Sequence, residues 1–313
     1  MPPPESTTDE HGFPIPKDFD GRDARPQPRR PRTPPSQKAR RWAAVLIALL
    51  MLGAATFPLL KEAGTAIWAR WHQQRSEQRY HSDDLPGALE DIETAISLRS
   101  DDAVSYYLRS QYRLDDYTRA DHAQMSLDDI NRAIELEPRQ PLFYEFRSRV
   151  LQRLGRYREA IEEIDRAIDL APPATAMQLN NRAYVRALGK IDLKEALDDV
   201  QESIRLDGGR SAASLDTRGY LFYLLEQYEP ALDDMNKTIV LAERHRQATI
   251  LGWEDSPVEA GERTFLLRPL DQALAVFYHH RGLIHEKLEN PQQAKADLAH
   301  GDKLGYDPEK GVW

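Results

Sequence analysis

The sequence predicts an all-α fold, in which a disordered tail and one transmembrane helix precede a solenoid of stacked helix pairs. Two observations support this prediction. A ten-residue helical block occurs six times, at successive offsets of 38, 34, 36, 35 and 63 residues, and a period in the thirties is typical of stacked repeats. Residues 42–60 form an apolar run without a single charged side chain, which is long enough to cross a bilayer.

The first 41 residues are predicted to be a disordered tail. They hold ten of the 21 prolines of the chain and show no apolar periodicity, so they cannot bury enough surface to offset the entropy of ordering. Residues 24–41 carry seven basic side chains and no acidic one. A nucleic-acid-binding arm is the weaker interpretation of this run, because it has no interleaved aromatic residues and the chain after residue 41 carries a net charge of −12. No nucleic-acid partner is therefore expected.

The run WAAVLIALLMLGAATFPLL at 42–60 is predicted to be a transmembrane helix. At about 1.5 Å per residue it spans roughly 28 Å, close to the hydrocarbon thickness of a bilayer. Its length and its distance from the chain start favour an uncleaved anchor, although the small residues at 53–55 leave a cleaved signal peptide as the alternative. Three basic residues stand directly before it, which predicts a cytoplasmic N-terminus and an extracytoplasmic body, periplasmic in a bacterium: Lys38, Arg40 and Arg41.

The first five ten-residue blocks have the pattern of an amphipathic helix, with apolar residues at the first, fourth, seventh or eighth and tenth places, and the sixth, KADLAHGDKL, is a degraded copy. The blocks begin at Leu89, Leu127, Ile161, Leu197, Leu232 and Lys295. A second helix is expected upstream of each block, with a small residue in its middle that lets two helices approach closely. These small residues are Ser76, Ser110, Ser148, Ala183, Gly219 and Gly282.

The blocks divide the body, residues 69–313, into six units that follow a connector at 61–68. The units are 69–102, 103–140, 141–175, 176–211, 212–245 and 275–308. The extra 29 residues of the last offset place an insertion at 246–274. Ser256-Pro257-Val258-Glu259 is a capping-box helix start, and a second helix start is predicted at Pro269, so an inserted turn or a short helix is expected before the last unit.

These units resemble the tetratricopeptide repeat family. The fullest copy contains Gly155, Tyr157, Ala160, Ile164, Ala167 and Pro172 in the pattern of the family, whereas Gly208 and Glu243 replace the usual closing proline in two other units. The resemblance implies a right-handed superhelix whose first helices line a concave groove that holds peptides or partner helices. By the pattern of the family, the groove residues are Tyr107, Gln111, Glu145, Arg149, Arg153, Asn180, Tyr184, Asp216, Tyr220 and Tyr223.

A second set of residues repeats in the same register. The third place of each block is acidic, and the residue before each small residue of the first helix is arginine. On a helical wheel the third place lies outside the apolar arc, so these acids are expected away from the core. We expect each arginine to form an ion pair with a block carboxylate, because its planar guanidinium suits two parallel hydrogen bonds. The set comprises Arg75, Arg109, Arg147, Arg182, Arg218 and Arg281 with Asp91, Asp129, Glu163, Asp199, Asp234 and Asp297.

No motif predicts catalysis. The chain has no cysteine, no HExxH, no GxGxxG, no phosphate-binding GK[ST] and no GxSxG, and a sixfold carboxylate is typical of architecture because catalytic sites are singular. We expect no metal, no cofactor, no small-molecule substrate and no enzyme activity. The predicted function is a membrane-anchored scaffold that binds a peptide or partner protein in its groove. The alternative is a non-catalytic accessory subunit of an envelope enzyme, secretion or transport complex. Trp68 and Trp71 lie at the membrane interface or pack in the first unit.

Overall fold

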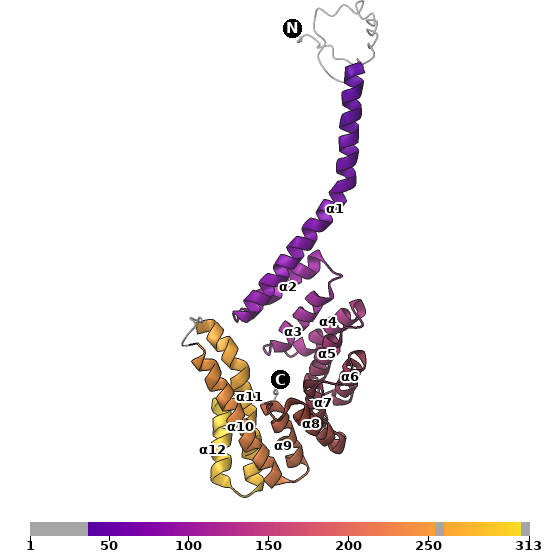
Figure 1. Cartoon of the computed structure of the whole chain (residues 1–313). Helices are drawn as coiled ribbons and strands as arrows, with labels where there is room; N and C mark the ends of the chain where they lie inside the picture. The colour runs from indigo at the N-terminus through magenta and orange to yellow at the C-terminus, as the bar shows by residue number, and fades with distance from the viewer. Residues whose placement is uncertain (1–36, 254–259, 308–313) are drawn as a thin grey trace, which may run out of the picture. The chain divides into compact units, whose positions relative to one another are not determined.

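The computed structural model describes residues 37–253 and 260–307, which form twelve helices and no strand. The chain divides into two compact units, Met1–Leu59 and Leu60–Trp313. Figure 1 labels the helices: α1 (Gln37–His81), α2 (Leu85–Leu98), α3 (Ala103–Asp115), α4 (His122–Leu136), α5 (Pro141–Arg153), α6 (Tyr157–Leu170), α7 (Ala176–Gly189), α8 (Leu193–Asp207), α9 (Ala212–Leu224), α10 (Tyr228–Leu251), α11 (Ala260–Lys287) and α12 (Pro291–Lys303).

Helix α1 begins earlier than the sequence pattern indicated. Residues 37–41, assigned to the disordered tail, are helical, and so is the connector 61–68. Gln, Lys, Ala and Arg are all strong helix formers, and they continue the helix without a break. The remainder of the tail, 1–36, and most side chains of 42–60 lie outside the described residues. Within the described residues, no helix is both long enough and apolar enough to span a membrane.

The repeat body consists of helix pairs in which each helix packs on the next. Pairs within a unit are α3–α4, α5–α6, α7–α8, α9–α10 and α11–α12, and neighbouring units meet through α2–α3, α4–α5, α6–α7, α8–α9 and α10–α11. Each predicted unit between 69 and 245 holds two of these helices. Side-chain caps fix several helix starts: Asp102 accepts from the Ser105 amide at 2.9 Å, and Thr175 and Gln178 form a reciprocal capping box before α7.

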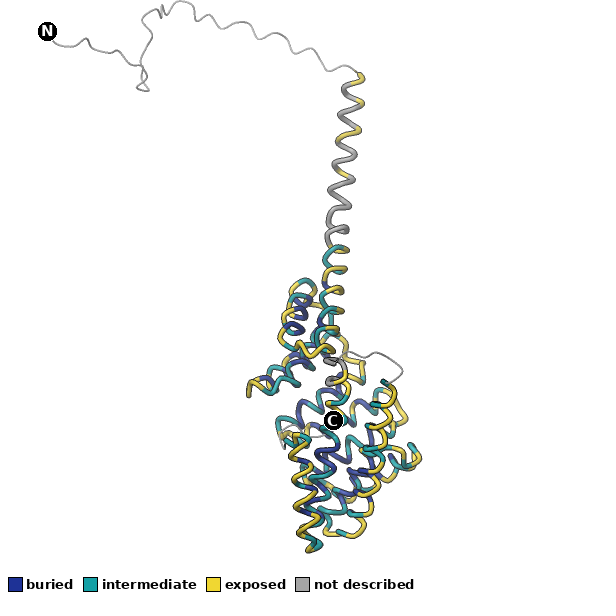
Figure 2. The backbone as a smooth tube through the Cα atoms, turned by 90° about the vertical axis from the view of Figure 1, so that its left-hand side faces the viewer, coloured by how far each residue is buried: buried dark blue, intermediate teal, exposed yellow. Residues whose placement is uncertain are grey.

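The core runs through the interior of the pairs, as the dark blue stretches in Figure 2 show. Apolar residues of the ten-residue blocks are fully buried, including Ile92, Ile130, Val200 and Met235. The small residue before each block is fully or almost fully buried, which permits close helix contact. In the second unit this contact is polar, because the Ser110 hydroxyl donates to the Ser126 carbonyl at 2.7 Å.

Within the insertion 246–274, the described residues 246–251 and 260–274 are helical and lengthen two existing helices. Helix α10 continues to Leu251, and α11 contains Pro269 in its interior, so the prediction of a helix start at Pro269 is wrong. The two extensions are held together, because Arg246 Nε donates to Asp271 Oδ1 at 2.6 Å and α10 packs on α11. This lateral support offsets the backbone hydrogen bond that proline removes. The start signal at Ser256 lies outside the described residues.

Candidate functional site

Each of the six arginines lies within ion-pair distance of the third-place carboxylate of its own unit. Each pair joins the first helix of a unit to its second helix, and in four units the arginine Nε and Nη2 donate to the two oxygens of one carboxylate. The distances are 3.3 Å for Arg75–Asp91, 2.6 Å for Arg109–Asp129, 2.7 Å for Arg147–Glu163, 2.6 Å for Arg182–Asp199, 2.7 Å for Arg218–Asp234 and 2.7 Å for Arg281–Asp297.

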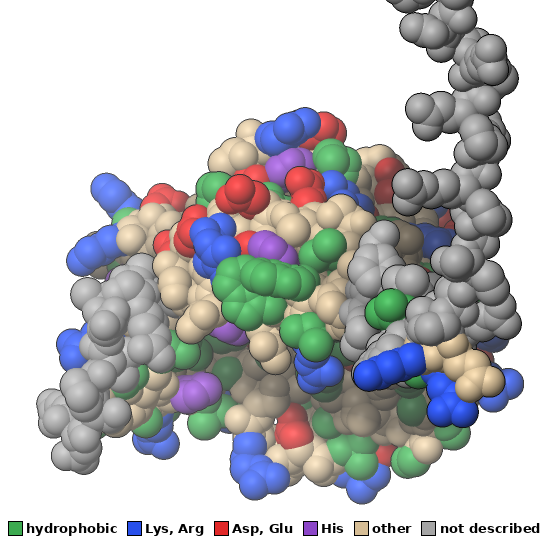
Figure 3. All heavy atoms as spheres, turned by 90° about the horizontal axis from the view of Figure 1, so that it is seen from above, with side chains coloured by type: hydrophobic (Ala, Val, Ile, Leu, Met, Phe, Trp, Pro, Cys, Tyr) green, Lys and Arg blue, Asp and Glu red, His purple; other side chains and the backbone are tan. Residues whose placement is uncertain are grey.

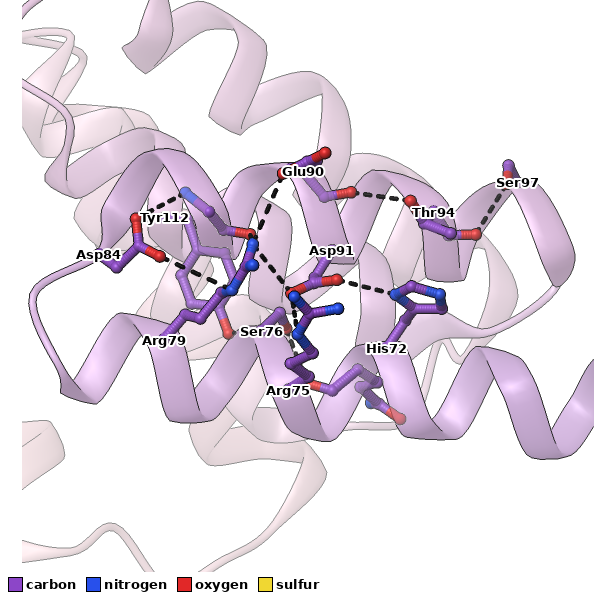
Figure 4. Close-up of polar contacts among 12 residues, drawn as sticks. His72, Arg75, Ser76, Arg79, Asp84, Glu90, Asp91, Thr94, Ser97 and Tyr112 are labelled. Carbon is purple, nitrogen blue, oxygen red and sulfur yellow. Dashed lines mark hydrogen bonds and ion pairs between the residues drawn. The ribbon is translucent and has the colours of Figure 1, made fainter.

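The first unit shows how much charge can gather on one such carboxylate. In Figure 4, Asp91 meets Arg75 and Arg79 of α1 on one oxygen and His72 on the other. The His72 ring nitrogen lies 2.8 Å from Asp91 Oδ1. Asp129 likewise has a second arginine partner, because Arg113 Nη1 lies 2.5 Å from Asp129 Oδ2. The carboxylate therefore links several turns of one helix to the next helix.

The third-place acids are more buried than the helical wheel indicated. Asp91, Asp129, Asp234 and Asp297 are all buried, whereas the neighbouring second-place Asp128 is exposed. In these four units the expectation that the third place faces away from the core is wrong; Glu163 and Asp199 are half-buried. The third-place carboxylate enters the interface between the two helices because a guanidinium from the facing helix neutralises it there.

Three of these arginines also have a partner in the preceding unit, which the sequence pattern did not predict. The fifth place of a block supplies an oxygen to the arginine of the following unit in three cases: Asn131 to Arg147 at 3.0 Å, Asp165 to Arg182 at 2.6 Å and Asn236 to Arg281 at 3.0 Å. A polar residue recurs at this place in the first five copies of the block, which is the signal that could have found it. Each such arginine therefore ties a unit to its predecessor as well as to itself.

A cavity of about 510 Å³ lies among α5, α7 and α9, with Phe277 of α11 in its wall. Its size is within the range of ligand-binding pockets. Five of the ten predicted groove residues line it, namely Glu145, Arg149, Asn180, Tyr184 and Asp216. The other five do not: Tyr107, Gln111, Arg153, Tyr220 and Tyr223.

Three residues of the cavity wall have polar atoms that are buried and lack a hydrogen-bond partner among the described residues. These atoms are Arg149 Nε, Gln152 Nε2 and Asn180 Oδ1. Buried polar groups are normally paired, and each unpaired one costs about 1–3 kcal/mol. Gln152 was not predicted as a groove residue, although it stands four places after Ser148, as the predicted Tyr223 does after Gly219; it is 6% exposed. Together the three atoms offer two donors and one acceptor to a molecule inside the cavity.

The carboxylates of the cavity are already bound to protein groups. Glu145 accepts from Gln178 Nε2 at 2.7 Å. Asp216 pairs with His280 of α11, whose ring nitrogen lies 2.8 Å from Asp216 Oδ1. Asp207 accepts from the Gly209 amide at 2.7 Å. The free hydrogen-bonding capacity of the cavity is therefore concentrated at Arg149, Gln152 and Asn180.

The predicted groove residues outside the cavity lie in aromatic clusters or beside them. The Tyr107 ring stacks on Phe143 at 5.5 Å, and burial raises the Tyr107 pKa. The Arg153 guanidinium lies 3.9 Å from the centre of the Tyr117 ring, a cation–π contact. Tyr220 and Tyr223 stack on each other at 6.1 Å. Gln111 is half-buried on α3.

Two tryptophans of α1 lie on the surface. Trp68 and Trp71 are 58% and 45% exposed, with their rings edge to face at 5.6 Å, so neither packs in the core of the first unit. Within the described residues no group of three or more His, Cys, Asp or Glu side chains is arranged to hold a metal ion. Figure 3 shows basic and acidic side chains interspersed over the face in view.

Comparisons with known proteins support the repeat. Residues 143–173 match the tetratricopeptide repeat family model. Tetratricopeptide repeat protein 13 of Homo sapiens is 31% identical over 117 residues, 36% of this chain and only 13% of that relative. Among solved structures, PilW, a widely conserved type IV pilus biogenesis factor, has a TM-score of 0.56 at 15% identity and covers 77% of this chain and 96% of its own.

Two further structures share the fold. The anaphase-promoting complex hetero-tetramer Cut9–Hcn1 gives a TM-score of 0.57 at 13% identity, over 84% of this chain and 44% of its own. Pseudomonas aeruginosa pilF has a TM-score of 0.50 at 13% identity and covers 77% of this chain and 94% of its own. Together with the helix pairs and their repeated ion pairs, these likenesses show that the body of the chain has the fold of a stacked helical repeat, in which residues 143–173 match the tetratricopeptide repeat model.

Proposed function

We propose that this chain is a membrane-anchored binding module that holds an extended segment of a partner protein in the cavity among α5, α7 and α9. The observation that carries the proposal is the set of unpaired atoms on Arg149, Gln152 and Asn180. An extended peptide presents carbonyl acceptors and amide donors in alternation, so one peptide group and its neighbour can satisfy all three.

The rest of the cavity wall suits a side chain of that segment. Ile164, Met177, Val185 and Phe277 supply an apolar surface, and Met177 is 62% exposed. Methionine adapts its shape to different apolar groups. The expected ligand is therefore a peptide with an apolar residue next to the backbone groups that meet Arg149 and Asn180.

Anchoring is the second part of the proposal. It is supported by the uncharged run at 42–60 and by the basic residues before it, and it places the body on the extracytoplasmic side. Carbonate extraction of membranes tests the anchor, and protease added to intact cells or spheroplasts tests the side. Release of the full-length chain by carbonate would contradict the anchor. A mature N-terminus near residue 55, found by mass spectrometry, would support the cleaved signal peptide.

Affinity capture from detergent-solubilised membranes tests the binding site. Arg149→Ala and Asn180→Ala are each expected to weaken recovery of a partner about tenfold, because each removes one buried hydrogen bond to the ligand. Arg166→Ala and Gln201→Ala are matched controls, since both residues are exposed and lie outside the cavity. Unchanged recovery with Arg149→Ala and Asn180→Ala, or an equal reduction with the two controls, would show that the partner binds outside this cavity. An accessory subunit of an envelope complex would bind its neighbour through this same cavity.

A further inference from the structure

The segment that follows α12 turns back toward α11. Helix α12 ends at Lys303, and Gly305 adopts a left-handed conformation with φ +85°, which L side chains rarely take. The Tyr306 amide then donates to the Gly301 carbonyl at 2.9 Å, a bond that closes the helix end. The chain is thereby redirected from α12 onto its neighbour α11.

The Tyr306 ring stacks on His279 of α11. Their ring centres are 3.8 Å apart and their planes differ by 11°. His279 stands three residues before the small residue Gly282 of its unit, which is the same place that Glu145, Asn180 and Asp216 occupy in theirs. Tyr306 therefore covers the groove position of the last unit with a residue of the same chain.

A row of further rings lies beside His279 and reaches the neighbouring unit. His280 stacks on Tyr220 at 4.5 Å, and Tyr220 stacks on Tyr223. Burial raises the pKa of Tyr220, and the phenols of Tyr223 and Tyr306 add to the rise. The next residue, Asp307, is half-buried. Burial raises the pKa of Tyr117, and Asp307 contributes to this rise although Arg153 opposes it.

We propose that residues 304–307 are an intramolecular occupant of the groove position at His279, which must be displaced when a partner segment extends past the cavity into the last unit. This inference rests on the proposed function, since it makes the segment a competitor of the partner.

Two variants of the full chain test whether the segment is docked. Tyr306→Ala removes the ring, and Tyr306→Phe keeps it as the matched control. In the wild type, burial lowers the pKa of His279, with His280 adding to the effect and Asp302 opposing it. A histidine NMR titration is expected to show the His279 pKa rising toward its ordinary value in Tyr306→Ala and unchanged in Tyr306→Phe. The same pKa in all three proteins would overturn the proposal.

A labelled peptide with the sequence of residues 302–313, DKLGYDPEKGVW, tests competition directly. It is expected to bind Tyr306→Ala about two- to tenfold more tightly than the wild type, the range that one aromatic stack gives. Equal binding to both proteins would overturn the proposal. Neither readout involves the partner, and Asn180→Ala is expected to leave both unchanged. Failure of the docked segment is therefore distinguishable from failure of the proposed binding function.

Discussion

Replacing Asp129 by asparagine is expected to destabilise the repeat strongly, whereas the same change at the adjacent Asp128 has almost no effect. Asp129 is 4% exposed and accepts three hydrogen bonds from two arginines, Arg109 at 2.9 and 2.6 Å and Arg113 at 2.5 Å. Asp128 is exposed, and its carboxylate accepts from Gln124 at 3.2 Å. The two substitutions are chemically identical and occur in one helix.

The expected loss in free energy of unfolding depends on the charges that Asp129→Asn leaves unpaired. Breaking a buried pair by removing one charge costs about 3–5 kcal/mol. Here two guanidiniums remain without a counter-charge, but both side chains keep some contact with water, at 18% and 11% exposure, and asparagine retains one acceptor oxygen. We therefore expect a loss of about 3 kcal/mol for Asp129→Asn and less than about 0.5 kcal/mol for Asp128→Asn.

Thermal unfolding followed by circular dichroism at 222 nm measures this difference. For a domain of this size about 1 kcal/mol shifts the melting temperature by roughly 2–4 °C, so Asp129→Asn is expected to melt about 6–12 °C below Asp128→Asn. Adding Arg109→Met and Arg113→Met to Asp129→Asn is expected to recover part of the loss, because it removes the unpaired charges. Melting temperatures within about 1 °C of each other for the two single variants would refute the assignment of buried, stabilising ion pairs.

Two further predictions concern packing and the contact between distant parts of the repeat body. Gly301→Val is expected to lower the free energy of unfolding by about 1–3 kcal/mol in a urea titration, because a Cβ at this position would lie 2.9 Å from the Ala275 carbonyl oxygen. Gly64→Ala is the control: a Cβ there has no neighbour within 4 Å, so alanine is expected to stabilise the helix slightly. Arg268 Nη2 donates to Asp83 Oδ2 at 2.7 Å across 185 residues, and this hydrogen bond lowers the pKa of Asp83. The contact is therefore fully present above the ordinary carboxyl pKa of 3.8 and is lost as the pH falls through the lowered pKa of Asp83. Spin-label distances between cysteines introduced beside the two residues, in a chain that has none of its own, are expected to lengthen at low pH and in Arg268→Glu; unchanged distances would contradict the link.

Much of the repeat could be predicted because its signals are local. The apolar periodicity of LDDINRAIEL at 127–136 and its five other copies specify helices, and the recurring arginine and third-place acid identify which side chains meet. The burial of Asp129 could not be predicted from a wheel. The wheel places a residue on its own helix, and the depth of that residue depends on the facing helix and its guanidinium.

The candidate site could be predicted only in part, for a related reason. The register of Glu145 and Asn180 is readable from one unit, but the cavity also needs Phe277, which lies more than 90 residues further along the chain than Asn180. The path of the chain beyond Lys303 depends on a single left-handed glycine, Gly305. Similarly, Pro269 stays inside a helix because a neighbouring helix supports it. These three features arise from contacts between distant segments, to which sequence periodicity is insensitive.

The central claim is that a partner segment occupies the cavity among α5, α7 and α9. A photo-crosslinking amino acid at Met177, which lines the cavity, tests it most directly when compared with the same amino acid at the exposed Arg166, in membranes containing the full chain. We expect a crosslink from position 177 that mass spectrometry maps to one continuous segment of one protein and that Arg149→Ala weakens about tenfold. Crosslinks from position 166 alone, or a position-177 crosslink of undiminished yield in Arg149→Ala, would contradict the claim.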